Sequence, residues 1–151
     1  MAKLAVLTAA QEERVRNLLG RAKGRFGSAE RASKRTSAQS GDYDNGFDGV
    51  VTGIYHILSA FELATTGRAR SYGEADAPTA ITHTVASLRA AGVHAPTAKE
   101  LTELNADRNT SVHGGLPASP FDTDRVLDAV DTARYFMGAV EQYLRQSGMN
   151  L

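Results

Sequence analysis

The stretch Asp48–Thr66, DGVVTGIYHILSAFELATT, decides the fold of this 151-residue chain. Gly67 follows it directly, and glycine is typical of the position just after a helix. The apolar residues of the stretch recur every three or four positions, which is the period of an α-helix: Val51, Ile54, Leu58 and Phe61. Because this apolar surface covers a wide arc, we expect the helix to lie at the centre of a bundle.

The N-terminal part of the chain predicts another long helix. Thr8 and Gln11 have the spacing of a capping box, which marks a helix start. Gly24 and Gly27 weaken the pattern, so whether the helix continues through Ser28–Ser37 stays open. One apolar stripe follows the capping box: Val15, Leu18, Leu19, Ala22 and Phe26.

Three further helices are predicted towards the C-terminus. One spans Pro78–Ala91, and a capping box at Thr97 opens the next. The last starts at Ser119–Asp122, with Pro120 in the first helical position. The connecting segments are predicted to be a turn and a polar loop: residues 40–46 and 68–77. Nothing has the pattern of a strand, so we expect one domain, residues 1–151, folded as an all-α, mainly antiparallel bundle of four to five helices.

Composition narrows the setting in which the protein works. Cysteine is absent, so we expect neither disulfides nor a thiolate metal site, and a reducing compartment fits. The apolar run at the N-terminus is too short for a signal peptide, and no stretch approaches the length of a membrane span. These features predict a soluble, cytoplasmic protein without a membrane partner.

Charge is unevenly distributed although the formal net charge is zero. The segment from Arg14 to Arg35 holds eight basic residues and one acid, Glu30, whereas the segment from Ser71 onward holds ten acids and six bases. The basic segment could present a strip to nucleic acid, because Lys and Arg neutralise phosphates. The alternative is a solvated helix face that meets the acidic part of the same fold. The residues predicted to contact RNA are Arg14, Arg21, Lys23 and Arg25.

A second candidate site is the run Arg108-Asn109-Thr110-Ser111-Val112-His113, which Gly114 and Gly115 close. It places a fixed cation, an amide and an imidazole near the expected end of a helix. Arginine holds a phosphate through a planar fork of donors, and histidine moves protons near neutral pH. A metal-free phosphodiester cleavage needs these groups, so Arg108, Asn109 and His113 are the candidate catalytic residues.

Spacing restricts how these three residues can act together. Asn109 and His113 are four residues apart, so they share a face of a helix. Arg108 and His113 are five residues apart and point about 140° apart around a straight helix. One uninterrupted helix therefore cannot bring both onto one phosphate. Either the chain bends, or the site lies at the interface of a homodimer.

Ordinary structural roles are the alternative for both residues. Arg108 lies four residues after Leu104, on or beside an apolar stripe, where an arginine is expected to pair with an acid. Glu103, Asp107 or an acid on a neighbouring helix would serve. His113 is favourably placed at the negative end of a helix.

The other histidines do not predict a metal site, because their spacing is not that of metal ligands. They are His56, His83 and His94. His56, between Tyr55 and Ile57, is more typical of a core residue than of a ligand. Arg89 and His94 repeat the spacing of Arg108 and His113 but span Gly92, a predicted helix stop, so we treat that pair as coincidental.

Two segments resemble HEPN domains. Residues 40–63 contain a Gly-Asp-Tyr turn that leads into a helix with central aromatic and small residues. Residues 101–115 contain an Arg-x4-His motif with a polar residue after the arginine, followed by glycine and one last long helix. The order of the predicted elements is similar over most of the chain.

The resemblance implies a HEPN-like helical bundle that forms homodimers. It further implies a metal-independent endoribonuclease without a cofactor, from a toxin–antitoxin or phage-defence system, with Arg108, Asn109 and His113 as catalytic residues. An antitoxin or another operon-encoded protein would then be a partner. Toxins paired with nucleotidyltransferase antitoxins usually have a tyrosine where this chain has Gly115, so silencing by modification is not expected. Other HEPN domains are inactive nucleotide-binding or protein-interaction modules, and this is the alternative function.

Overall fold

The computed structural model describes residues 3–113 and 121–151, with side chains described for 3–108 and 121–151. The described residues form five α-helices and no strand, which confirms the predicted all-α class. In chain order the helices are α1 (Ala9–Lys34), α2 (Ser40–Thr66), α3 (Ala77–Ala90), α4 (Ala98–His113) and α5 (Thr123–Gln146).

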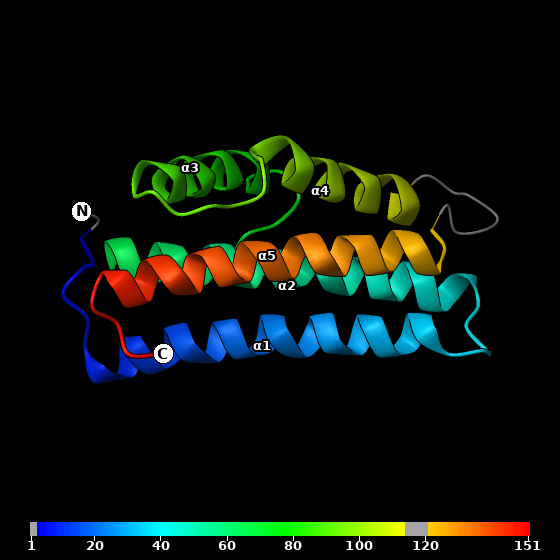
Figure 1. Cartoon of the computed structure of the whole chain (residues 1–151), viewed down its shortest axis with the longest axis horizontal. Coiled ribbons are helices and arrows are strands. Elements are labelled where there is room, and N and C mark those ends of the chain that lie inside the picture. The colour runs from blue at the N-terminus through cyan, green and yellow to red at the C-terminus, as the bar shows by residue number, and fades with distance from the viewer. Residues whose placement is uncertain (1–2, 114–120) are drawn as a thin grey trace.

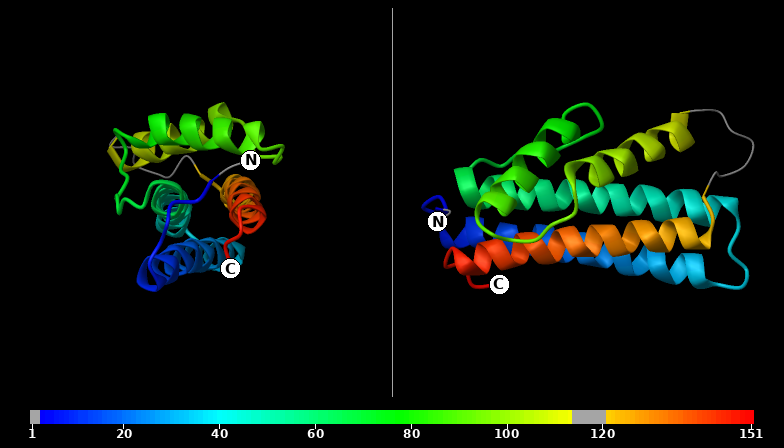
Figure 2. Two further views of the ribbon diagram at one scale, coloured as in Figure 1. Left: turned by 90° about the vertical axis from the view of Figure 1, so that its left-hand side faces the viewer. Right: turned by 45° about the horizontal axis from the view of Figure 1, so that its top comes forward.

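Three long helices, α1, α2 and α5, lie side by side, and the shorter α3 and α4 cover one side of them (Figure 1). The chain reverses direction between α1 and α2, and α5 runs in the same direction as α2 (Figure 1). In the end-on view, α1 lies on the side of α2 and α5 that faces away from α3 and α4 (Figure 2). Helix α2 contacts each of the other four described helices, which confirms the predicted central position of its sequence.

Helices α1 and α2 approach each other closely. A Cβ atom built on Gly53 would lie 2.4 Å from Cε1 of Phe26, much nearer than two carbon atoms can come. Both Phe26 and the neighbouring Ile54 are buried. Glycine at position 53 therefore leaves the space that the Phe26 ring occupies between the two helices.

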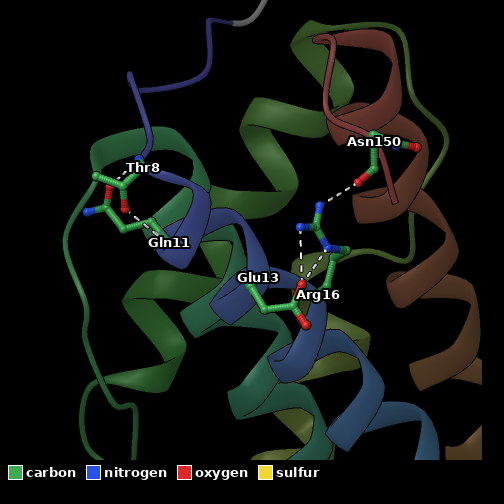
Figure 3. A network of polar contacts seen from close by, with 5 residues as sticks. All are labelled: Thr8, Gln11, Glu13, Arg16 and Asn150. Carbon is green, nitrogen blue, oxygen red and sulfur yellow. Dashed lines mark hydrogen bonds and ion pairs between the residues drawn. The ribbon is translucent and has the colours of Figure 1, made fainter.

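Helix α1 is continuous, which answers the question left open for residues 28–37. It begins with the predicted capping box: Gln11 N–H donates to Thr8 Oγ1 (3.1 Å), and Thr8 N–H donates to Gln11 Oε1 (2.9 Å) (Figure 3). Gly24 has open space around it, but the helix continues past it because Phe26 and Ala29 are buried in the core on either side of Gly27. Burial of these residues outweighs the low helix propensity of glycine.

Helix α2 begins at Ser40, so the predicted turn at residues 40–46 is wrong, and Asp48 is not the helix start. Asp42 accepts a hydrogen bond from Gln39 N–H (2.9 Å) and thereby caps the first turn. The Phe47 ring stacks on Phe121, with ring centroids 3.9 Å apart. Contacts with a distant part of the chain thus stabilise a helix in a segment whose composition favours a turn.

Helix α5 begins at Thr123, later than predicted. Asp122 is its N-cap and accepts a hydrogen bond from Arg125 N–H (2.8 Å), so Asp122 lies before the first turn rather than within it. Ser119 and Pro120, the predicted start, lie outside the described residues.

The other predicted helix ends agree closely with the structure. Gly67 caps α2 with φ 76°, and Gly92 follows α3 with the same value, so both glycines adopt the left-handed conformation expected after a helix. At the start of α4, Thr97 Oγ1 accepts a hydrogen bond from Glu100 N–H (3.1 Å). None of the helices in the described ranges is long and apolar enough to cross a membrane.

Candidate functional site

Arg108, the cation of the predicted catalytic run, connects α4 to α2. Its Nε donates to Oδ1 of Asp48 at 2.7 Å. The Arg108 side chain is 22% exposed and that of Asp48 is 41% exposed. The acid that pairs with Arg108 therefore comes from a neighbouring helix, which was one of the three alternatives that the sequence left open.

A buried polar pair lies close to this contact. The Tyr55 hydroxyl donates to Oδ1 of Asn105, and Asn105 Nδ2 donates to the carbonyl of Glu74 (3.2 Å). Burial raises the pKa of Tyr55, and the nearby positive charge of Arg108 partly opposes this effect. Tyr55 is thus held in its neutral, hydrogen-donating form. No pattern in the sequence predicts this pair, because Asn105 meets Tyr55 only when α4 packs on α2.

Asn109 and His113 lie in the last turns of α4, which runs to His113, but their side chains lie outside those described. The helix is assigned without a break from Ala98 to His113. The backbone positions of Arg108 and His113, five residues apart on it, are therefore about 140° apart around the helix axis. That Arg108 of one copy and His113 of a second copy act on the same phosphate stays a prediction.

Arg14, Arg21 and Arg25 lie along one side of α1, all of them exposed. Arg21 is seven residues after Arg14, and Arg25 is eleven residues after it. These spacings place Arg21 and Arg25 each within about 20° of Arg14 around the helix axis. The three arginines line two adjoining hollows, of about 830 and 280 Å³, between α1 and α2. Arg21 and His56 line both hollows, which together we call the α1–α2 groove.

Lys23, the fourth residue predicted to contact RNA, does not line this groove. It is nine residues after Arg14, or about 180° around α1. It lines a separate hollow of about 240 Å³ with Met137 and Glu141 of α5. The structure therefore brings three of the four predicted residues together and separates the fourth.

Arg16 also lies apart from the groove. Its guanidinium donates to Glu13 Oε2 (3.2 Å) and to the backbone carbonyl of Asn150 (2.9 Å), so it fastens the C-terminal segment to α1 (Figure 3).

His56, interpreted from the sequence as a core residue, is only half-buried and lies in the groove wall. Burial lowers the pKa of its imidazole, and the positive charges of Arg25, Arg21 and Arg14 lower it further. The spacing of Gly46, Gly49 and Gly53 before His56 places all four on one side of α2, a pattern from which the groove could have been predicted.

The loop after α2 extends the smaller hollow. The Arg70 guanidinium lies 4.7 Å from the centre of the Tyr72 ring, and Arg70 also pairs with Asp76 at 3.4 Å. Asp76 in turn accepts a hydrogen bond from Gly73 N–H (2.8 Å), which fixes the loop. Arg70 and Tyr72 thus join Arg14, Arg21 and His56 around this hollow.

Few acidic residues lie near the arginines of the groove, so the positive charge there is largely not neutralised. Glu30, the one acid of the basic segment, bonds Arg134 of α5 at 2.6 Å, and this hydrogen bond is the main reason why its pKa is lowered. Among the residues that line the groove, Asp42 is the acid, at the end away from Arg14. The acids Glu100, Glu103, Asp107 and Asp128 line a hollow between α4 and α5 instead. Arg14, Arg21 and Arg25 therefore do not line the hollow that holds these four acids.

No group of three or more His, Asp or Glu side chains that could hold a metal ion occurs in the described parts of the chain. No protein-family model, curated protein or solved structure matches this chain. Membership of the HEPN family therefore stays a prediction from the two sequence segments.

Proposed function

We propose that this protein binds RNA in the α1–α2 groove and cleaves it as a metal-independent endoribonuclease of the HEPN type, within a toxin–antitoxin or phage-defence system. The observation that carries the proposal is the convergence of Arg14, Arg21 and Arg25 around His56 with little acid nearby. Guanidinium groups bind phosphates through paired hydrogen bonds, and a row of them suits a polyanion.

In this proposal the chemistry belongs to the end of α4. Arg108 neutralises the phosphate as it becomes pentacoordinate, and His113 exchanges protons with the 2′-hydroxyl or the leaving 5′-oxygen. Asn109 orients His113 or binds a phosphate oxygen. The RNA supplies its own nucleophile, so the products carry a 2′,3′-cyclic phosphate and a 5′-hydroxyl. The bond from Asp48 to Nε of Arg108 supports this role, because it limits the directions in which the guanidinium can point.

The Arg108–Asp48 contact also favours a second candidate, a non-catalytic HEPN-like module that binds a nucleotide or an antitoxin-like protein. There Arg108 would serve only to hold α4 on α2, as the buried Tyr55–Asn105 pair does. The two candidates differ in whether the protein cleaves RNA.

Cleavage of an end-labelled single-stranded RNA by the full chain tests the proposal. We expect Arg108→Ala and His113→Ala each to reduce the rate by about 10²-fold or more, the usual contribution of such groups. The double variant should be little slower than either single one, because the two residues act as a unit. Cleavage should persist in EDTA.

Arg89→Ala and His94→Ala are the matched controls, because they have the same spacing but flank the end of α3. Both should cleave at the normal rate. An intact His113→Ala variant that cleaves as fast as the parent, or a parent that cleaves no RNA, would contradict the ribonuclease proposal.

A further inference from the structure

The centre of the α1–α2 groove is the point where its two hollows adjoin, at Arg21 and His56. We propose that His56, Arg21 and Arg25 form a phosphate-binding subsite that takes a phosphodiester group of a single-stranded RNA. The subsite rests on the RNA binding proposed above, but not on ribonuclease activity.

The surroundings of His56 suit an anion. His56, on α2, faces three arginines of α1, and their positive charges lower the pKa of its imidazole: Arg14, Arg21 and Arg25. Its own helix contributes the neutral residues Thr52 and Ser59 to the same hollow. Four groups of one sign would repel one another once the imidazole is protonated, so an anion is the group that this arrangement lacks.

Nearby acids do not supply that anion. Asp42 lines the larger hollow but is fourteen residues before His56, or about 21 Å along α2. On the loop, Asp76 forms an ion pair with Arg70 and accepts a hydrogen bond from Gly73 N–H. Glu62, on α2, lies near Tyr72 and contributes to the raised pKa of that tyrosine. Burial and three arginines, rather than a carboxylate of the described residues, determine the pKa of His56.

The length of the groove favours a strand over a mononucleotide. Arg14 and Arg25 are eleven residues apart, or about 17 Å along α1, and Arg31 extends the row to about 26 Å. Only a ligand with several phosphates can contact the whole row. Tyr72, at the Arg14 end, offers an aromatic ring near the bases of such a strand.

Proton linkage gives a specific test of His56. In the empty groove, burial and the three arginines disfavour the protonated imidazole. A bound phosphodiester reverses that effect, so binding should raise the pKa of His56 and take up a proton. The affinity for the strand should therefore increase as the pH falls towards and below the pKa of the bound state.

The probe should be a fluorescent oligouridylate of twelve nucleotides with 2′-O-methyl groups. The methyl group removes the nucleophile, so the strand cannot be cleaved while its binding is measured. Its phosphodiesters keep one charge throughout, whereas a phosphate monoester titrates near pH 6 and would obscure the linkage. Fluorescence anisotropy then gives the Kd of the full chain between pH 8 and pH 5.5.

We expect the Kd of the parent protein to fall by up to about tenfold over this range, the limit set by one unit of pKa change. His56→Gln should weaken binding at low pH and remove that fall, and Arg21→Gln and Arg25→Gln should weaken binding at all pH values. Lys23 lies on the opposite side of α1, so Lys23→Gln should bind the strand normally. His83 is exposed on α3, so His83→Gln should keep the pH dependence of binding.

The pKa of His56 can also be measured on the parent protein itself, with a variant used only to assign the signal. The imidazole signals, assigned by comparison with His56→Gln, give the pKa of His56 by NMR with and without the oligonucleotide. A rise of about one unit on binding supports the subsite. An unchanged pKa of His56, or an unchanged pH dependence in a folded His56→Gln variant, overturns it.

Cleavage of unmodified RNA separates this proposal from the ribonuclease. Binding linked to His56 without cleavage supports the subsite and contradicts the ribonuclease. Cleavage together with binding that does not depend on His56 overturns the subsite and leaves the ribonuclease in place.

Discussion

Arg108 bonds Asp48 while most of its side chain is withdrawn from solvent, so its contribution to folding can be measured apart from any catalysis. Exposed ion pairs contribute at most about 1 kcal/mol, and breaking a fully buried one costs about 3–5 kcal/mol. For this half-buried pair we expect Arg108→Ala and Asp48→Asn each to lower the free energy of unfolding by about 1–2 kcal/mol, measured by urea denaturation.

Arg145→Ala is the matched control for that measurement. Arg145 pairs with Glu141 one turn away on α5, and its side chain is 56% exposed. We expect a loss of at most about 0.5 kcal/mol. Equal losses at Arg108 and Arg145 would show that the contact with Asp48 does not fasten α4.

His56 predicts a dependence of stability on pH. Its pKa is lowered in the folded protein, so below the ordinary histidine pKa of about 6.5 the unfolded chain binds more protons than the folded one. Stability should therefore fall as the pH decreases from 7.5 to 5.5. The lowered pKa values of Glu30 and Asp76 act in a more acidic range, where their stabilisation is lost as they become protonated.

Melting temperatures of the parent and of His56→Gln at the two pH values check this expectation. The difference between the two pH values should shrink in His56→Gln, but not in His83→Gln, whose histidine is exposed on α3. A parent protein whose melting temperature does not respond to pH would contradict it.

At the scale of the elements, the close contact of α1 and α2 depends on Gly53. In Gly53→Ala the new Cβ would lie 2.4 Å from the Phe26 ring, so either this buried ring or the two helices must shift. We expect a loss of about 1–3 kcal/mol in the free energy of unfolding, as for other overpacked cores.

Gly49→Ala lies one turn earlier on the same helix, and its Cβ would meet nothing within 4 Å. This variant should be unchanged or more stable by up to about 1 kcal/mol, because alanine favours a helix more than glycine does. If both variants were equally stable, the separation of α1 and α2 would not depend on position 53.

The sequence predicted helices better than it predicted their ends. Period and capping signals located α2, α3 and α4, because burial of an apolar stripe and local hydrogen bonds act within a few residues. The first two turns of α2 were missed because they depend on the stacking of Phe47 on Phe121, which is remote in sequence. No local pattern reports such a contact.

The candidate site was predictable to a similar degree. The separation of Lys23 from Arg14 follows from helical geometry and could have been obtained from the residue numbers alone. The position of His56 beside three arginines could not, because it depends on how closely α1 packs against α2. The partner of Arg108 was left among three alternatives for the same reason.

At the scale of the whole molecule, the five-residue spacing of Arg108 and His113 on α4 predicts a composite site in a homodimer. Arg108 of one copy would then act with His113 of the other. A mixture of inactive Arg108→Ala and His113→Ala variants should regain cleavage, because each mixed dimer holds one complete site.

With free exchange of subunits, about half of the dimers are mixed and each has one of two sites, so about a quarter of the parent activity should return. A mixture of Arg108→Ala with the double variant should regain none. Sedimentation of the parent as a monomer at tens of micromolar would contradict the composite site.

Positive and negative side chains gather on different sides of the molecule, so an electric field would favour one orientation of it. The arginines of α1 and the acids between α4 and α5 lie on opposite sides of the bundle, although the formal net charge is zero. This separation of charge contributes a dipole moment to the molecule although its formal net charge is zero. A polyanion would turn it so that α1 arrives first, and the gain in encounter rate would fade once dissolved ions shorten the reach of the field to about 8 Å.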